Sequence, residues 1–201
     1  MESNMLQIDE RKPVPQFALF ALGFRPFFSL AGLFGIFSML LWMLLYLFAA
    51  QIPTATLVPM DWHAHEMIFG YAMAVVAGFL LTAVSNWTGV PTWSGWRLAL
   101  LVSLWLFARV ALLLPVENAL LLAAVADLLF GIGLLIGVSL PVLRVKLWKQ
   151  AGILVKLVLM FVANLVFYAG AMGYLELGTH IGLYFGIYMI LALLFMMMRR
   201  V

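Results

Sequence analysis

The sequence predicts an all-α membrane protein, a polytopic bundle of six transmembrane helices. Of its 201 residues, 67% are hydrophobic and only 9% are charged, and the mean hydropathy is +1.15. A soluble domain is about 45–50% apolar and about 25% charged, and a core of this size cannot hide such an excess. Long apolar runs separated by short polar segments supply the spans, because about 20 apolar residues cross the hydrocarbon layer.

The chain opens with a polar segment, residues 1–16, which prolines interrupt and which we expect to be loosely ordered. Gly23, Arg25 and Pro26 then mark the start of the first helix, since proline is tolerated in a first helical turn. We therefore divide the chain into a cytoplasmic N-terminal segment and a six-helix transmembrane domain, residues 17–201.

The expected spans alternate with turns that contain proline, glycine or charged residues. Asp61 is a good N-cap for the second span, because its side chain can accept hydrogen bonds from the free N–H groups of a first turn. Pro115 follows the third span, and Pro141 marks the end of the fourth. The spans are expected at about 27–50, 62–85, 96–114, 119–142, 152–174 and 180–198.

Positive charge is confined to one set of loops and termini. The loops at 51–61, 115–118 and 175–179 contain no lysine or arginine. The other set carries Arg11, Lys12, Arg97, Arg144, Lys146, Lys149, Arg199 and Arg200. Lysine and arginine concentrate on the cytoplasmic side of membrane proteins, so both termini are expected in the cytoplasm. All three histidines then lie toward the external side.

The composition also excludes several classes of site. The chain has no cysteine, which excludes disulfides, thiolate metal sites, iron–sulfur clusters and cysteine nucleophiles. The net charge of +3 is attributed to topology and anionic lipid rather than to nucleic acid. The sequence contains no glycine-rich phosphate loop and no nucleophile–base arrangement, so nothing in it favours an enzyme.

Residues 61–67 (DWHAHEM) are the first candidate for function, because polar groups at the end of a membrane helix are costly. Neutral imidazole binds copper, zinc and haem iron. On a regular helix His63 and His65 differ by about 200° and cannot share one ion. Either this turn is non-helical or each histidine serves a different partner, and Glu66 could orient a ligating ring. The alternative is an interfacial belt of histidine and tryptophan.

Arg109 and Asp127 are the only charges deep in the third and fourth spans. They are expected to form an ion pair that neutralises two costly charges. The functional alternatives are a haem propionate or small anion held by Arg109, or a proton route through Asp127 in a small transporter or channel. Asn164, in the middle of the fifth span, is expected to bond to a neighbouring helix.

Small residues recur at every fourth position in two spans and form a stripe on each. The stripes consist of Gly70, Ala74, Gly78 and Thr82 in the second span, and of Gly178, Gly182 and Gly186 in the sixth. Such stripes let helix backbones approach closely in lipid. If the two faces meet, His65 and His180 come near each other, which makes His180 a further candidate for cofactor binding.

Several blocks of the sequence, in this order and spacing, resemble the NnrS family. The strong similarity covers about residues 22–97, and weaker similarity continues to the end of the chain. The blocks are residues 22–28 (LGFRPFF), 61–67 (DWHAHEM) with 69–71 (FGY), 78–84 (GFLLTAV), 86–89 (NWTG) and 94–96 (SGW).

The resemblance implies a bacterial inner-membrane protein that binds haem and copper and is associated with denitrification and relief of nitric oxide stress. It places candidate haem or copper ligands at His63 and His65, and it assigns no role to Glu66 or Arg25. Family members are expected to be about twice as long, so the chain corresponds to their first half. It would then be a fragment, a short member, a truncated assembly partner, or a subunit that pairs with a second half-length chain or with itself.

Overall fold

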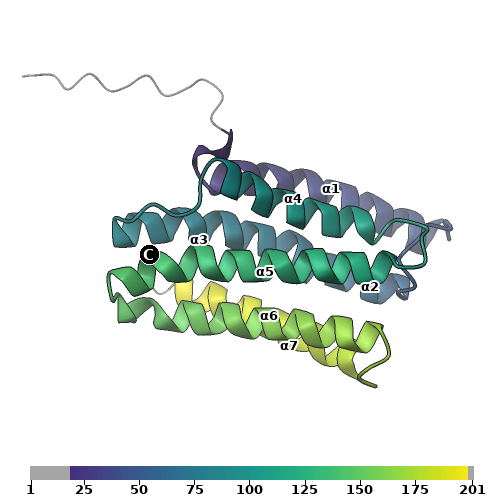
Figure 1. Ribbon diagram of the computed structural model, residues 1–201. Helices are drawn as coiled ribbons and strands as arrows, with labels where there is room; N and C mark the ends of the chain where they lie inside the picture. The colour runs from purple at the N-terminus through teal and green to yellow at the C-terminus, as the bar shows by residue number, and fades with distance from the viewer. Residues whose placement is uncertain (1–18, 199–201) are drawn as a thin grey trace, which may run out of the picture.

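The computed structural model describes residues 19–198, and this part of the chain folds into helices without strands (Figure 1). The prediction of an all-α fold is therefore confirmed. The elements are η1 (Leu19–Ala21), α1 (Phe24–Leu47), α2 (Pro59–His65), η2 (Glu66–Ala72), α3 (Met73–Thr88), α4 (Trp96–Ala111), α5 (Ala119–Arg144), η3 (Trp148–Gln150), α6 (Ala151–Ala171) and α7 (Gly178–Met198).

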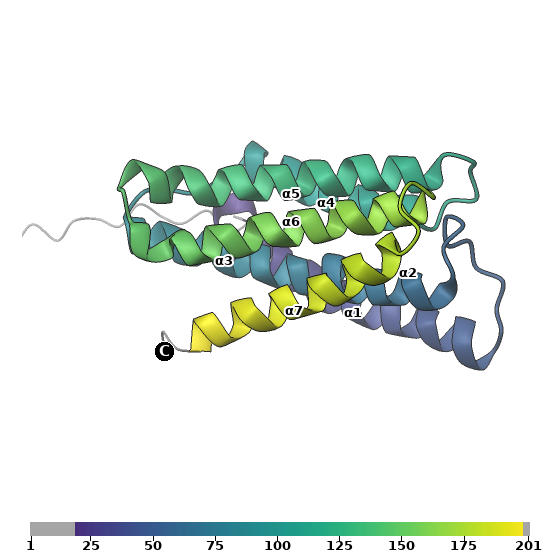
Figure 2. The same ribbon diagram turned by 90° about the horizontal axis from the view of Figure 1, so that it is seen from below.

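The long helices run alternately up and down in one elongated bundle, as the two ribbon views show (Figures 1 and 2). The rod formed by α2, η2 and α3 holds a central position in this bundle. It contacts α1, α4, α5 and α7, while α5 joins α4 to α6 and α6 packs along α7. A residue that faces inward from the rod therefore meets side chains from several helices.

Five helical segments are long and apolar enough to cross a membrane: 24–47, 59–88, 119–144, 148–171 and 178–198. The chain is therefore a membrane protein. The expected third span, 96–114, is shorter in the structure, because α4 has 16 residues and ends at Ala111. The N–H groups of Leu113 and Leu114 bond to carbonyls three residues back, so the chain tightens into a narrower turn before Pro115.

The second span begins earlier than expected and has a different cap. Pro59 is its first residue, Val58 precedes it, and no side chain caps this end. The prediction of Asp61 as N-cap is therefore wrong, because Pro59 starts the helix with a φ angle already suited to it and with no N–H to satisfy. The segment ends at Thr88, where Gly89 adopts a φ of 65° and donates its N–H to a carbonyl of the last turn.

The two small-residue stripes do not face each other, so that prediction is also wrong. A Cβ added at Gly178 would lie 2.6 Å from the Cα of Gly170, and one at Gly182 would lie 2.6 Å from a backbone nitrogen of α6. The stripe of α7 thus packs mainly on α6. Gly70 instead faces side chains of α4 and α1, and Gly78 faces α1. Both stripes allow close packing, but they serve different neighbours.

Candidate functional site

The central rod changes its helical geometry at η2, a π-helix that begins directly after His65. A π-helix bonds each N–H one residue further back than an α-helix does and often occurs at functional sites. Trp105 of α4 supports this segment, because its indole Nε1 donates to the Gly70 carbonyl at 3.0 Å. The wider turn lies where His65 and Glu66, which are adjacent in sequence, both point into the core.

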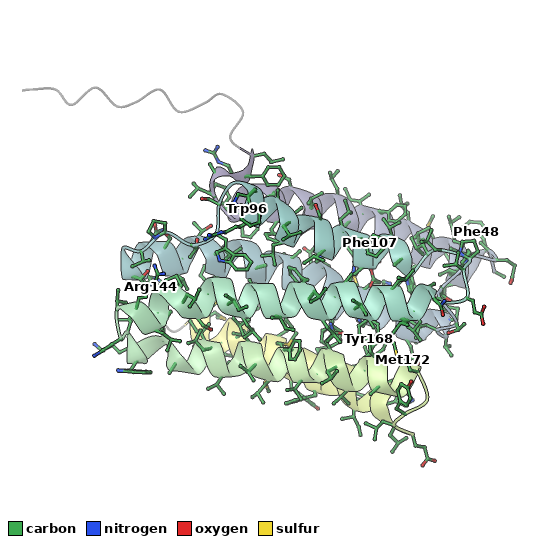
Figure 3. All side chains as sticks on the ribbon, viewed as in Figure 1. Phe48, Trp96, Phe107, Arg144, Tyr168 and Met172 are labelled. Atoms are coloured by element: carbon green, nitrogen blue, oxygen red, sulfur yellow. The ribbon has the colours of Figure 1, made fainter. Side chains whose placement is uncertain are left out.

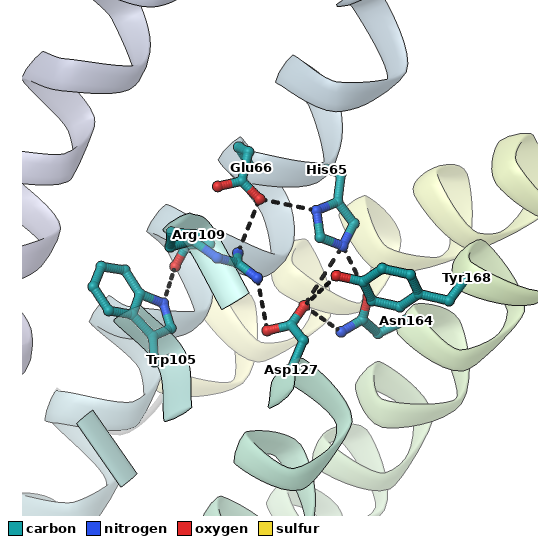
Figure 4. A network of polar contacts seen from close by, with 8 residues as sticks. His65, Glu66, Trp105, Arg109, Asp127, Asn164 and Tyr168 are labelled. Carbon is teal, nitrogen blue, oxygen red and sulfur yellow. Dashed lines mark hydrogen bonds and ion pairs between the residues drawn. The ribbon is translucent and has the colours of Figure 1, made fainter. Parts of the chain in front are cut away.

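His65 is fully buried and touches two other helices (Figure 4). Its Nδ1 lies 3.1 Å from Glu66 Oε1, and its Nε2 lies 3.0 Å from Asn164 Oδ1 and 3.6 Å from Asp127 Oδ2. The ring also stacks on Phe167, with centroids 4.3 Å apart. Both ring nitrogens therefore face oxygen atoms inside the bundle.

Arg109 joins the two buried carboxylates. Its Nη1 lies 3.1 Å from Glu66 Oε1 and its Nη2 lies 2.7 Å from Asp127 Oδ1. The expected ion pair between Arg109 and Asp127 is therefore present, with Glu66 as a second carboxylate. The guanidinium is only 3% exposed, and its contacts are ion pairs rather than well-aligned hydrogen bonds. Its charge is balanced where water cannot screen it.

Asp127 connects α5 to α6 through hydrogen bonds. Its Oδ2 accepts hydrogen bonds from Asn164 Nδ2 at 2.9 Å and from the Tyr168 hydroxyl at 3.2 Å. The expectation that Asn164 bonds to a neighbouring helix is thus confirmed. Since its amide nitrogen donates to a carboxylate, its oxygen must accept from His65 Nε2. We call His65, Glu66, Arg109, Asp127, Asn164 and Tyr168 the polar network.

His63 points to a different neighbour. The turn that holds both histidines is α-helical, so the two rings cannot face one partner. The His63 ring stacks on Trp42 of α1, with centroids 4.5 Å apart and planes 13° apart. Its Nδ1 is buried, and no side chain or backbone group of residues 19–198 forms a hydrogen bond with it.

His180 does not join either histidine in this arrangement. It lies in the first turn of α7 and is exposed, whereas His65 is fully buried. The glycines nearest to it in the α7 stripe, Gly178 and Gly182, pack on α6, and the stripe meets the central rod only further along, where Gly186 faces Ile68 and Phe69 of η2. The structure thus leaves His180 outside the polar network.

Comparison with protein families identifies the chain. Residues 18–201 match the family model described as NnrS protein. The chain belongs to the NnrS family. No curated protein and no solved structure matches it.

A haem or copper ligand in this NnrS chain needs a side-chain donor atom that no other group of the protein already engages. His65 does not fit as a ligand in this arrangement, because both of its ring nitrogens are engaged. His63 fits, because its buried Nδ1 has no partner. No group of three or more His, Asp or Glu side chains suited to a metal occurs within residues 19–198.

Two residues of this NnrS arrangement are not among the site residues predicted from the sequence. Tyr168 lies four residues after Asn164, and Trp105 lies four residues before Arg109. Residues four apart share one face of a helix. This spacing was the available signal, and it places each aromatic donor on the same face as a polar residue already singled out. Tyr168 then bonds to Asp127, and Trp105 bonds to η2.

Proposed function

We propose that this chain is a haem- or copper-binding integral membrane protein of the nitric oxide response or of denitrification, with a binding rather than an established catalytic role. Membership of the NnrS family supports the nitric oxide response. The observation that carries cofactor binding is the partnerless Nδ1 of His63 in the DWHAHEM motif. Neutral imidazole nitrogen is a ligand that copper and haem iron both accept.

The surroundings of His63 add a second reason. Trp42, on which the ring stacks, also lines a groove of about 500 Å³ along the outer face of α1. Met39 and Met43 line the same groove. Thioether sulfur suits Cu(I), and methionine also serves as an axial ligand of haem iron. We therefore assign His63 as the principal ligand, with Met39 and Met43 as soft donors in the groove that its stacking partner Trp42 also lines.

The polar network takes a supporting role in this proposal. His65, two residues after His63, contacts Glu66 and Asn164 of α6 and so fixes their positions relative to α2. It thereby sets the direction in which α2 presents His63. The transport alternative is less well supported, because Arg109 is engaged by two carboxylates. The cavity beside Asp127 measures about 20 Å³, which is room for a single water molecule.

The membrane topology belongs to the same proposal. We count α4 as the third of six spans, because it runs beside α5 through the bundle, although its 16 residues extend only about 24 Å. Six spans and basic loops on one side put both termini in the cytoplasm. The membrane is then the bacterial inner membrane, and His63 lies near its external face.

The absorption spectrum and copper content of the purified protein test the proposal. Protein from cells supplied with haem precursor and copper should carry a haem band, bound copper or both. His63→Ala should lose the bound cofactor, and His180→Ala, which changes an exposed histidine, should retain it. A colourless, copper-free wild-type protein would contradict cofactor binding. Full retention in His63→Ala would contradict the choice of ligand.

A further inference from the structure

A large apolar groove separates α7 from the central rod. Figure 2 shows α7 diverging from α6 toward its C-terminal end. The groove that opens there measures about 660 Å³, and its walls run from Tyr71 to Trp87 on one side and from Ile190 to Met198 on the other. Phe28 of α1 closes its edge. Because these segments belong to candidate spans, the groove lies at the depth of lipid acyl chains.

The groove wall is shaped for flexible chains rather than for another helix. Helices that associate in lipid meet through small residues, which let their backbones approach. This wall instead presents larger side chains such as Val75, Phe79, Leu194 and Met197, and Ala72 and Ala83 are the small residues among those that line it. A lipid chain can follow such an irregular surface, whereas a helix about 10 Å wide cannot approach it closely.

Basic residues gather at one end of the bundle and acidic residues at the other. The groove reaches the end where α3 and α7 finish, near Asn86 and Met198. Within residues 19–198, every lysine and arginine except the buried Arg109 belongs to this end or the turn next to it: Arg25, Arg97, Arg144, Lys146, Lys149 and Lys156. Figure 3 shows Trp96 and Arg144 toward this end and Phe48 and Met172 toward the other.

Acidic residues occupy the opposite end. Outside the polar network, the carboxylates of residues 19–198 are those of Asp61, Glu117 and Glu176, and all three lie in or beside the turns remote from the groove mouth. The mouth therefore attracts negative charge. Asn86 is exposed there and adds amide N–H donors suited to phosphate oxygen.

We propose that the groove between α3 and α7 binds one anionic phospholipid, with an acyl chain between Val75 and Leu194 and the phosphate at the basic end beside Asn86. The apolar walls accept the chain, and the positive end selects the headgroup. The site is independent of haem and copper, because none of its walls includes His63 or the polar network.

Native mass spectrometry of the full chain released from detergent tests this site, with phosphatidylglycerol and phosphatidylcholine offered in turn. Wild-type protein should retain one phosphatidylglycerol, with a preference over phosphatidylcholine of about fivefold for each basic residue that the phosphate meets. Val75→Trp fills the groove and should lower retention about tenfold, as overpacking of a fitted site does. Val125→Trp is the matched control, because Val125 is exposed on α5 away from the groove.

The outcomes separate the possible occupants. Equal retention by the two tryptophan variants would overturn the site, and equal retention of the two lipids would overturn its charge selectivity. A dimer of the chain that Val75→Trp dissociates would show that a second copy fills the groove and would also overturn the proposal. If Val75→Trp fails to fold by circular dichroism, Leu194→Trp fills the same groove from α7 and gives the same readout.

Discussion

Asp127 is the residue through which the core of the bundle is connected by polar atoms. It is 1% exposed and contacts side chains from α2, α4 and α6. A carboxylate in such a place is stable only when paired, because its removal from water costs several kcal/mol after relaxation. The network around it therefore contributes to a unique arrangement of helices, while its net contribution to stability is small.

Removing Arg109 should be more damaging than removing Asp127, because Arg109 pairs with two buried carboxylates. We expect Arg109→Ala to lower the free energy of unfolding by about 3–5 kcal/mol, since it leaves Glu66 and Asp127 without their cation. Asp127→Ala should cost less, since Glu66 still pairs with Arg109. The double variant should lose clearly less than the sum of the two. Unfolding curves in detergent for the four proteins give the comparison. Additive losses would mean that the two residues act independently, contrary to their contact at 2.7 Å.

Replacing each of the two histidines of the motif should also change the stability of the protein by different amounts. His65→Ala removes contacts to Glu66 and Asn164, and hydrogen bonds to charged groups contribute about 1.5–3 kcal/mol. His63→Ala removes a stacked ring at a half-buried position and should cost less than about 1.5 kcal/mol. The same unfolding curves measure both changes. If His63→Ala lowered the free energy of unfolding more than His65→Ala, it would contradict the structural role that we assign to His65.

At the level of elements, the backbones of α6 and α7 approach each other closely at Gly170, Gly178 and Gly182. Their contact depends on glycine, because Cβ atoms at Gly178 and Gly182 would meet backbone atoms of α6 at 2.6 Å. Backbone cannot yield as a flexible side chain does. The divergence of α7 beyond this contact then opens the groove beside α3.

A methyl group at this contact should force the two helices apart. We expect Gly182→Ala to cost about 1–3 kcal/mol through overpacking. Gly32→Ala in α1 is the matched control, because its added Cβ would meet no atom of another helix within 4 Å and alanine favours a helix by about 1 kcal/mol. Thermal unfolding in detergent compares the two variants. Equal midpoints for both would show that α6 and α7 are not in contact at Gly182.

At the level of the whole molecule, the sequence predicts helices well and their neighbours poorly. Apolar runs and turn residues located the spans, because a long apolar segment has few alternatives in lipid. Partners across helices depend on which faces meet, and small-residue stripes do not say which neighbour they serve. His65 and Asn164 are 99 residues apart in sequence yet in contact. The π-helix η2 likewise had no signal in the apolar pattern.

Accessibility of single cysteines should establish the topology of the whole chain. Wild-type protein has no cysteine, so each introduced thiol reports alone. Glu117→Cys and Glu176→Cys lie in exposed turns at the acidic end, and Lys146→Cys lies in an exposed turn at the basic end. A membrane-impermeant maleimide should label the first two in intact spheroplasts and Lys146→Cys only after lysis, because basic loops remain in the cytoplasm. Labelling of Lys146→Cys alone would invert the topology and place His63 near the cytoplasmic face.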